Sequence, residues 1–363
     1  MKKIKFEKYS LYGNDFVIID ETQQELLTEE QKSSFAKISF DDIFGMSADN
    51  LLVIQKNTHE NLNQIKAYRN YWTTLDADSV KDVDFIFRMF EPDGSEALCC
   101  GNGLLSIAYY LEDEYGIEHS TILTEIPIGK PVIRKLISEL TDDYSALNIG
   151  VPRAVPDSFL IGPSFSRKNE LQEILNFKLS SNPLLKIFGY DQPDIELNGY
   201  LKFTGEPHLV VFSHENNDDL FNILIGDDYN LNDRVQGILN FDLSNQILNL
   251  LGLELNNMKS VFPKGINLNV ARVLNHNIIE YRTFERGIDR ETYACGTGAT
   301  AVAFVASHLR LVDGEEIFLF PKRPRTFTGN NMELKVLPNQ ENGDWILKGK
   351  PQKIFTGYRN LDF

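Results

Sequence analysis

Two segments of the sequence, Cys100-Gly101-Asn102-Gly103 and Cys295-Gly296-Thr297-Gly298, carry the same pattern 195 positions apart. Each is a cysteine, then Gly-x-Gly, then an uncharged apolar run, which predicts helices over 101–112 and 296–311 that begin directly after the cysteines. A helix N-terminus has unpaired backbone N–H groups and a partial positive charge, so it binds a carboxylate, and a cysteine there ionises more readily. The sequence therefore predicts two equivalent helix starts that carry thiols.

The repeat extends upstream of both cysteines. Phe87-Arg88-Met89-Phe90-Glu91 precedes the first cysteine, and Tyr281-Arg282-Thr283-Phe284-Glu285 precedes the second. Farther upstream, residues 13–19 resemble residues 205–211, in the same order. The period is too long for a solenoid, and paired segments in the same order favour a duplicated domain over chance similarity of glycine-rich turns.

Chain length predicts about two domains, because 363 residues exceed the usual size of one. We place the halves at 1–150 and 151–363, with 147–155 as the passage between them, and leave open a return of the C-terminal strands to the first domain. The stretches 56–82 and 213–260 are predicted to be surface insertions rather than domains.

Composition excludes several classes of protein. Apolar residues make up 42% of the chain, as in ordinary globular proteins, and the net charge of −16 argues against nonspecific binding to nucleic acid or anionic membranes. No run of about 18 apolar residues and no apolar signal core appears. Three cysteines do not make a secreted disulfide framework, which indicates a cytoplasmic protein. The expected partner is a small molecule, and a homodimer is left open.

The coarse layout is mixed and rich in strands. Thr28 is a helix cap with Glu29 and Glu30 in the first turn, and 243–251 also has a helical pattern, so helices are predicted at 29–38, 101–112, 243–251 and 296–311. Strands are predicted at 15–20, 50–55, 84–90, 120–126, 131–137, 200–204, 208–212, 266–274, 278–285, 316–320, 332–337 and 352–356.

Two thiol-bearing helix starts on either side of one amino acid suit a specific reaction. Both helix ends would stabilise the enolate-like charge that develops when the α-proton leaves. One thiolate would remove that proton, and the opposite thiol would deliver another to the other face. We expect no pyridoxal phosphate, metal or other cofactor for this chemistry.

Several motifs together resemble the diaminopimelate epimerase family. Besides the two cysteine segments, they are Gly13-Asn14-Asp15-Phe16, Asp93-Gly94-Ser95-Glu96, Pro207-His208 and Glu285-Arg286-Gly287. The resemblance implies an isomerase that converts LL- to meso-diaminopimelate, a precursor of lysine and peptidoglycan. It also implies an α/β (α+β) fold of two pseudo-symmetric domains, each a barrel-like sheet around a central helix, with the active site in the cleft between them.

The same resemblance implies roles for individual residues. Cys100 and Cys295 would be the acid–base pair, with His208 and Glu285 assisting near the reacting carbon. The α-carboxylate would be bound by Gly101, Asn102, Gly296 and Thr297. The far end of the substrate would be bound by Asn14, Asn50, Asn267 and Arg286.

Two positions depart from the family. Glu91 and Glu206 stand where the family has asparagine, and an ionised carboxylate accepts hydrogen bonds but donates none. Two glutamates would repel a distal carboxylate and attract a distal cation. We therefore count Glu91 and Glu206 as substrate-binding residues and keep, as an alternative, a racemase of a basic amino acid such as histidine. Glu91 could instead simply pair with Arg88, and Glu285 with Arg282.

A different class of function is a thiol redox or metal-binding protein that uses all three cysteines. Against it, the sequence has no Cys-x-x-Cys, and no histidine lies at ligand spacing from a cysteine. Cys99 is predicted to be a buried small apolar residue.

Overall fold

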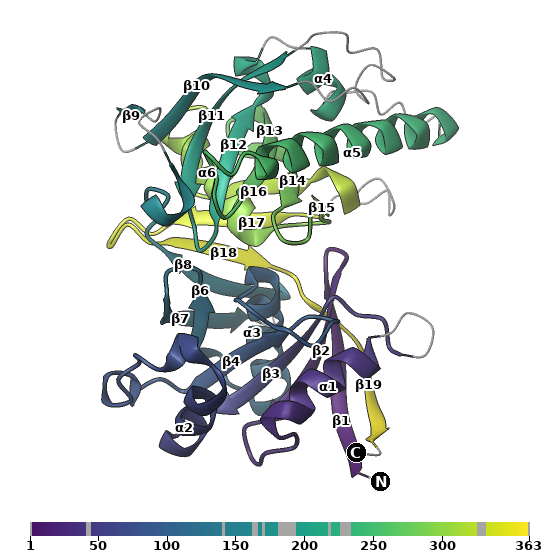
Figure 1. The fold of residues 1–363 in the computed structure, drawn as a ribbon, viewed down its shortest axis with the longest axis vertical. Helices are drawn as coiled ribbons and strands as arrows, with labels where there is room; N and C mark the ends of the chain where they lie inside the picture. The colour runs from purple at the N-terminus through teal and green to yellow at the C-terminus, as the bar shows by residue number, and fades with distance from the viewer. Residues whose placement is uncertain are drawn as a thin grey trace. The chain divides into compact units, whose positions relative to one another are not determined.

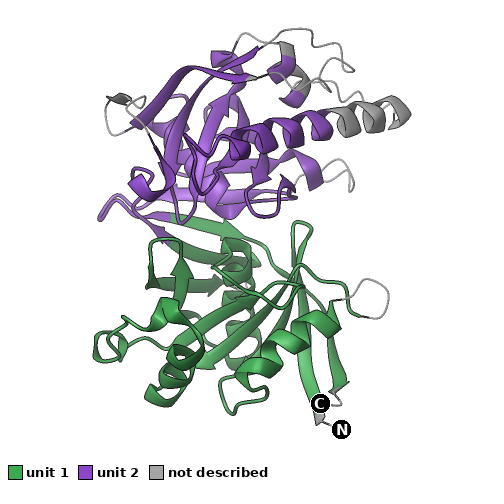
Figure 2. Cartoon of the chain, viewed as in Figure 1, with its two compact units in different colours: residues 1–148, 346–363 green, residues 149–345 purple. Residues whose placement is uncertain are grey.

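Two compact units make up the chain (Figure 2). Unit 1 comprises Met1–Asn148 and Ile346–Phe363, and unit 2 comprises Ile149–Trp345. The chain thus leaves unit 1 inside the stretch 147–155 and re-enters it at Ile346, for most of its second-last strand and all of its last. The computed structural model describes residues 2–40, 45–139, 142–161, 166–168, 171–180, 194–216, 219–225, 234–324 and 332–361.

Unit 1 is one mixed sheet with three helices among its described residues (Figure 1). The strands are hydrogen-bonded in the order β19-β1-β2-β3-β4-β6-β7-β8, and the short β5 pairs with β4. The elements are β1 (Lys2–Leu11), β2 (Asn14–Glu21), α1 (Glu29–Ser39), β3 (Asn50–Lys56), α2 (His59–Tyr68), β4 (Phe85–Phe90), β5 (Glu96–Ala97), α3 (Gly101–Tyr115), β6 (His119–Ile126), β7 (Lys130–Glu139), β8 (Tyr144–Gly150) and β19 (Gln352–Leu361).

Unit 2 repeats this order. Its strands pair as β9-β10-β11-β12-β13-β14-β16-β17, and the short β15 pairs with β14. The elements are β9 (Ser166–Lys168), β10 (Leu171–Ser180), β11 (Asp194–Phe203), β12 (Pro207–Phe212), α4 (Asp219–Ile225), α5 (Arg234–Asn257), β13 (Asn267–Asn275), β14 (Ile278–Glu285), β15 (Arg290–Glu291), α6 (Gly296–His308), β16 (Ile317–Pro321) and β17 (Leu334–Pro338). Strand β18 (Trp345–Gly349) begins at the last residue of unit 2 and otherwise belongs to unit 1.

Strand directions match between the units as well as strand order. β2–β3 and β12–β13 are parallel, β3–β4 and β13–β14 are antiparallel, and β4–β6 and β14–β16 are parallel. One apolar helix is central to each sheet: α3 packs against β1, β2 and β7, and α6 packs against β11 to β14, β16 and β17. The α/β fold of two pseudo-symmetric halves is therefore confirmed.

Most of the predicted elements are present. β14 has the predicted bounds, Ile278–Glu285, and Thr28 caps α1 through a capping box with Gln31. The helix predicted at 243–251 is the middle of the longer α5, and the one predicted at 296–311 ends at His308. The elements that were not predicted are strands β1, β5, β8, β9, β10, β15 and β18 and helices α2 and α4.

The stretch 56–82 is packed against the sheet rather than looped over the surface. It forms α2 and two short 3₁₀ turns, η1 (Asn70–Trp72) and η2 (Asp78–Val80). Trp72 is fully buried, in a cluster that includes Ile86 of β4 and Leu123 of β6. Burial of an aromatic ring of this size stabilises the unit by about 2 kcal/mol or more. Neither this stretch nor 213–260 forms a separate unit.

Membrane-spanning helices are absent from the part of the chain that the structure describes, because no helix there is both long and apolar enough.

Candidate active site

Each of the two repeated cysteines, Cys100 and Cys295, caps a helix. Cys100 is the N-cap of α3, with φ −113° and ψ 127°, and Cys295 is the N-cap of α6, with φ −116° and ψ 112°. Both thiol-bearing residues therefore directly precede the N–H groups of a first helical turn, which have no partner within the helix. These first turns contain the predicted carboxylate-binding residues Gly101, Asn102, Gly296 and Thr297.

Sheet register places further predicted residues at equivalent points of the two units. Asn50 at the start of β3 lies opposite Phe16 of β2, and Asn267 at the start of β13 lies opposite His208 of β12. Asn50 is thus the counterpart of Asn267, and Phe16 is the counterpart of His208.

A matching turn precedes β2 and β12. Gly13 has φ 98° and Gly205 has φ 103°, a backbone conformation that L side chains rarely adopt. Asn14 follows the first glycine and Glu206 follows the second. The turn, and not only the sequence around it, is therefore duplicated.

In unit 1 the predicted residues form two hydrogen-bonded pairs. Asn102 Nδ2 donates to Asn14 Oδ1 at 3.3 Å, and Asn50 Nδ2 donates to Glu91 Oε2 at 2.9 Å. Burial raises the pKa of Glu91 above its ordinary value, against the hydrogen bond from Asn50, which lowers it. Unit 1 thus brings together four of the residues predicted to bind substrate.

In unit 2 the buried His208 connects a strand to the start of α6. Its Nδ1 lies 3.0 Å from Asn269 Nδ2, and its Nε2 lies 3.0 Å from Thr297 Oγ1. Burial, with a further contribution from the charge of Arg286, lowers the pKa of His208 to about 3. The imidazole is therefore neutral across the physiological pH range.

The hydrogen-bond network assigns the tautomer of His208. Asn269 Nδ2 also donates to the carbonyl oxygen of Leu209 at 3.4 Å, and Thr283 Oγ1 donates to Asn269 Oδ1 at 3.0 Å. A carbonyl oxygen only accepts, so the amide nitrogen of Asn269 faces His208 and Nδ1 accepts from it. The imidazole proton is on Nε2 and is donated to Thr297.

The sulfur of Cys295 lies within this network. Sγ accepts from the backbone N–H of Gly298 at 3.4 Å and lies 3.4 Å from Thr297 Oγ1. Thr204 Oγ1 in turn donates to the carbonyl oxygen of Thr297 at 2.7 Å. A sulfur that faces two donors is better suited to carry a negative charge, because hydrogen bonds to the charged form favour that form.

Arg286 and Glu206 form an ion pair in unit 2. The Nε of Arg286 donates to Glu206 Oε2 at 3.1 Å, and its Nη2 binds the same oxygen. The backbone N–H of Arg286 donates to Asn267 Oδ1 at 2.8 Å. Burial raises the pKa of Glu206, against the lowering effect of Arg286. The two departures from the family thus differ: Glu206 pairs with a cation, and Glu91 with an amide.

A glutamate bound by a buried arginine recurs four residues before each cysteine. Arg88 binds Glu96 through two hydrogen bonds of 2.7 and 2.8 Å, and Arg282 binds Glu291 through two of 2.7 Å. The guanidinium groups therefore hold β5 and β15, the short strands that lead into the cysteine helices. Glu285, the counterpart of Glu91, accepts a hydrogen bond from the hydroxyl of Thr292.

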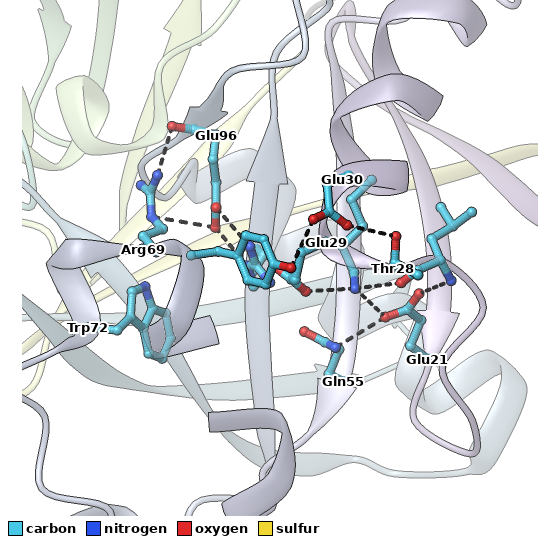
Figure 3. Close-up of polar contacts among 12 residues, drawn as sticks. Glu21, Thr28, Glu29, Glu30, Gln55, Arg69, Trp72 and Glu96 are labelled. Atoms are coloured by element: carbon cyan, nitrogen blue, oxygen red, sulfur yellow. Dashed lines mark hydrogen bonds and ion pairs between the residues drawn. The ribbon is translucent and has the colours of Figure 1, made fainter. Parts of the chain in front are cut away.

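In unit 1 this clamp belongs to a longer chain of alternating charges (Figure 3). Arg88 also pairs with Glu29, and Glu96 lies 3.5 Å from Arg69. Lys32, with a fully buried side chain, continues the chain from Glu29 to Glu21. Each of these charges has a partner of opposite sign, which offsets part of the cost of burying it. Burial nevertheless raises the pKa of Glu21, against the lowering effect of Lys32.

Three residues of the unit 2 network were missed from the sequence: Thr204, Asn269 and Thr283. A signal exists for Asn269, because Asn267-Leu268-Asn269 alternates within a buried strand and places both amides on one face. The threonines carry no such signal, since threonine is common in strands.

The alternative based on all three cysteines gains no geometric support. Cys99 is half-buried rather than buried as predicted, and its N–H donates to the carbonyl oxygen of Glu125. The group of metal-capable side chains found among the described residues is Glu7, Asp113 and Glu114, and the ammonium group of Lys353 ion-pairs with all three at 2.9–3.0 Å.

Known proteins resemble this chain along most of its length. The family model for diaminopimelate epimerase matches residues 6–152. The diaminopimelate epimerase of Methanocaldococcus jannaschii is 28% identical over 320 residues, 84% of this chain and 85% of that protein. The enzyme of Methanocella arvoryzae is 29% identical over 311 residues, 85% and 84% of the two chains. A probable proline racemase from Agrobacterium radiobacter has a similar fold, with a TM-score of 0.57, 12% identity and coverage of 99% and 93%.

The duplicated fold with a cysteine at each helix start, together with these relatives, defines an isomerase, an epimerase or racemase of amino acids. The chain is similar in sequence to diaminopimelate epimerases over most of its length. The thiol redox or metal-binding alternative is not favoured.

Proposed function

We propose that this protein interconverts LL- and meso-diaminopimelate, with Cys100 and Cys295 as the acid–base pair. The observation that carries the proposal is the duplicated N-cap: each thiol directly precedes the first-turn N–H groups of a Gly-x-Gly helix start, in equivalent positions of the two units. One thiolate takes the α-proton, and the thiol from the other unit returns a proton to the opposite face. The relatives named above support diaminopimelate as the substrate.

The α-carboxylate of the substrate is bound by the helix N-termini in this proposal. Removal of the α-proton moves negative charge onto that carboxylate, and donors already oriented toward it need no reorganisation as the charge grows. The first-turn N–H groups after Cys100 and Cys295 supply these donors. Gly101 and Gly296 let the carboxylate approach the backbone closely.

The distal end of diaminopimelate, which carries an ammonium and a carboxylate, complements the Glu206–Arg286 pair. Arg286 already neutralises Glu206, so the repulsion expected between this glutamate and a distal carboxylate is largely cancelled. A basic amino acid would offer the pair only a cation. The ion pair thus supports diaminopimelate over the basic amino-acid alternative, which the relatives do not favour either.

We place the reaction in the cytoplasm. The mechanism needs two reduced thiols, and a cytosolic redox poise keeps thiols reduced.

Exchange of the α-proton in heavy water tests the proposal. The purified chain is incubated with LL- and meso-diaminopimelate and, separately, with L-histidine, L-lysine, L-ornithine and L-arginine. We expect deuterium at the α-carbon, with change of configuration, for diaminopimelate only. Exchange of a basic amino acid at equal or higher kcat/KM would contradict the substrate assignment, and no exchange with any of them would contradict the function.

The variant Glu206→Asn restores the residue typical of the family. If the Glu206–Arg286 pair binds the distal ammonium and carboxylate groups of diaminopimelate, this variant still catalyses the reaction but with a changed KM for diaminopimelate. A matched Glu91→Asn variant shows whether the amide-bonded glutamate of unit 1 contributes as well.

A further inference from the structure

Three buried polar residues of unit 2 replace apolar residues at the same places in unit 1. Leu52 pairs with Ile18 on one side and Met89 on the other, and Asn269 pairs in the same way with Val210 and Thr283. The register therefore makes the following pairs equivalent: Phe16 and His208, Leu52 and Asn269, and Met89 and Thr283.

A second observation confirms that these positions face the cysteine helices. A Cβ added at Gly103 of α3 would lie 3.3 Å from a methyl carbon of Leu52. A Cβ added at Gly298 of α6 would lie 2.5 Å from Asn269 Oδ1. In both units the strand residue thus touches the third residue after the cysteine, but it is apolar in unit 1 and an amide in unit 2.

The hydrogen bonds among the polar residues of unit 2 all point the same way, from Asn269 through His208 toward Cys295. Asn269 donates to Nδ1 of His208, so the imidazole donates from Nε2 to Thr297. A hydroxyl that accepts from His208 has its own hydrogen left for another acceptor, and Cys295 Sγ lies 3.4 Å away. In such a chain each hydrogen bond polarises the next, and the last donor favours the thiolate form of Cys295.

We infer that Asn269 is a positioning residue that acts through His208 and Thr297 to direct a hydroxyl hydrogen at Cys295 Sγ and stabilise the thiolate. The inference rests on the proposed function in taking Cys295 as one of the two acid–base thiols. It adds a feature that the equivalent, apolar positions of unit 1 lack: a chain of hydrogen bonds that prepares the thiol of Cys295 to act as a base.

Few other groups around Cys295 titrate near neutral pH. His208 on β12 is neutral because of its low pKa. Tyr281 on β14 donates its hydroxyl hydrogen to the carbonyl oxygen of Cys295 at 3.2 Å. Arg286, after β14, is a permanent cation and pairs with Glu206. Gly298 on α6 supplies a backbone donor that no side-chain substitution removes.

Alkylation of Cys295 against pH tests this inference without any substrate. The full-length protein reacts with iodoacetamide between pH 5 and 10, and mass spectrometry of the Cys295 peptide gives the rate, since the thiolate is the reacting form. In Asn269→Leu, which installs the residue of unit 1, the midpoint of the rate profile should rise by about one pH unit, the effect of losing one hydrogen bond to a charged group.

Variants of Thr297 check the last step of the pathway. Thr297→Val removes the hydroxyl and should raise the midpoint as much as Asn269→Leu does, whereas Thr297→Ser keeps the hydroxyl and should keep the midpoint near that of the wild type. Thr300→Val is the matched control on α6, because Thr300 Oγ1 donates only within its helix, to the carbonyl oxygen of Gly296 at 3.0 Å. Circular dichroism establishes that each variant is folded.

A raised midpoint in Thr297→Val with an unchanged midpoint in Asn269→Leu would overturn the role of Asn269. Unchanged midpoints in both variants, or an equal rise in Thr300→Val, would overturn the whole pathway. These results are independent of the reaction catalysed: a protein that failed to exchange the α-proton of diaminopimelate would contradict the proposed function while the alkylation profiles still decided the role of Asn269.

Discussion

Unit 1 and unit 2 share their strand order, their helix caps and their arginine–glutamate pairs. They differ in the polarity of the strand residues that pack against the cysteine helices. In unit 1 the positions equivalent to His208, Asn269 and Thr283 are occupied by Phe16, Leu52 and Met89, all buried. Cys295 begins α6 beside His208 and Asn269, both fully buried and both hydrogen-bonded. Burial of such polar groups is tolerated only because each has a partner.

This difference between the units separates two requirements for an enzyme that inverts the configuration of a carbon atom. On the proposed mechanism, both faces of the carbon need a thiol and a set of N–H donors, and the helix starts that carry the cysteines are duplicated. The polar residues beside Cys295 are not duplicated, because apolar residues stand at the equivalent positions of unit 1. Substitutions at equivalent positions can therefore test which features the two halves still share.

Loss of either thiol should have the largest effect. Cys100→Ala and Cys295→Ala are each expected to lower the epimerisation rate by about 10³-fold or more, because net inversion needs an acid and a base on opposite faces. The measurement is the rate of LL- to meso-diaminopimelate conversion. Turnover within tenfold of the wild type in either variant would show that the two helix starts are not equivalent in function.

Arg282→Met should strongly destabilise unit 2. The variant leaves Glu291 fully buried without the guanidinium that binds both of its oxygens, and the partner that remains in the described structure is the amide of Asn245. Removing one member of a buried ion pair costs about 3–5 kcal/mol. Urea unfolding at neutral pH measures the loss.

The matched variant Arg88→Met should cost about half as much. Glu29 keeps Lys32 as a second cation, and Glu96 keeps Arg69, so neither carboxylate loses all of its compensation. Equal destabilisation by the two variants would mean that the longer charge network of unit 1 has no energetic advantage over the isolated clamp of unit 2.

Acid should weaken unit 2 through His208. Its pKa of about 3 in the folded protein lies below the value of about 6.5 in an unfolded chain, so its stabilising contribution is present above pH 6.5 and is lost as the pH falls toward 3. The slope is about 1.4 kcal/mol per pH unit, or about 2 kcal/mol between pH 6.5 and 5.

The variant His208→Gln isolates this effect, because Phe16, the equivalent residue of unit 1, does not titrate. The difference in unfolding free energy between wild type and variant should shrink by about 2 kcal/mol from pH 7.5 to 5. A difference that stays constant with pH would show that the imidazole is protonated in the folded protein.

A smaller contrast is expected at the glycines of the two cysteine helices. Gly298→Ala forces Asn269 Oδ1 away from a contact of 2.5 Å, whereas Gly103→Ala meets Leu52 at 3.3 Å. Alanine is more favourable than glycine in a helix by about 1 kcal/mol. This gain offsets more of the cost of the contact with Leu52 than of the closer contact with Asn269. Gly298→Ala should therefore be the less stable variant, by about 1–2 kcal/mol in urea unfolding. Equal stabilities would indicate that Asn269 can move without cost.

Local sequence signals predicted the repeated elements well. The cap at Thr28, the strand predicted at 278–285 and the glycines after each cysteine are read within a few residues, and each marks an observed boundary. β1 was missed for a local reason as well: its buried residues change phase between Phe6 and Tyr9, because the pairing with β19 shifts between Lys8 and Tyr9.

Candidate residues were predictable only where a motif marked them. The sequence placed His208 and Thr297 in the site through resemblance, but their contact with each other depends on which strand lies beside α6. Asn269 acts through a hydrogen bond whose direction is set by the carbonyl group of Leu209 on a neighbouring strand. Such a role depends on register, and register is a property of strand pairs rather than of one strand.

The pairing of β1 with β19 has a consequence for the order of assembly (Figure 1). The ribosome releases β19 only after the whole of unit 2 has been made, so unit 2 has all of its strands while the sheet of unit 1 still has an open edge at β1. Domains fold as units during synthesis, usually from the N-terminus. Here the half that is translated first is completed last, and until then β1 has backbone groups exposed to any other strand that can pair with them.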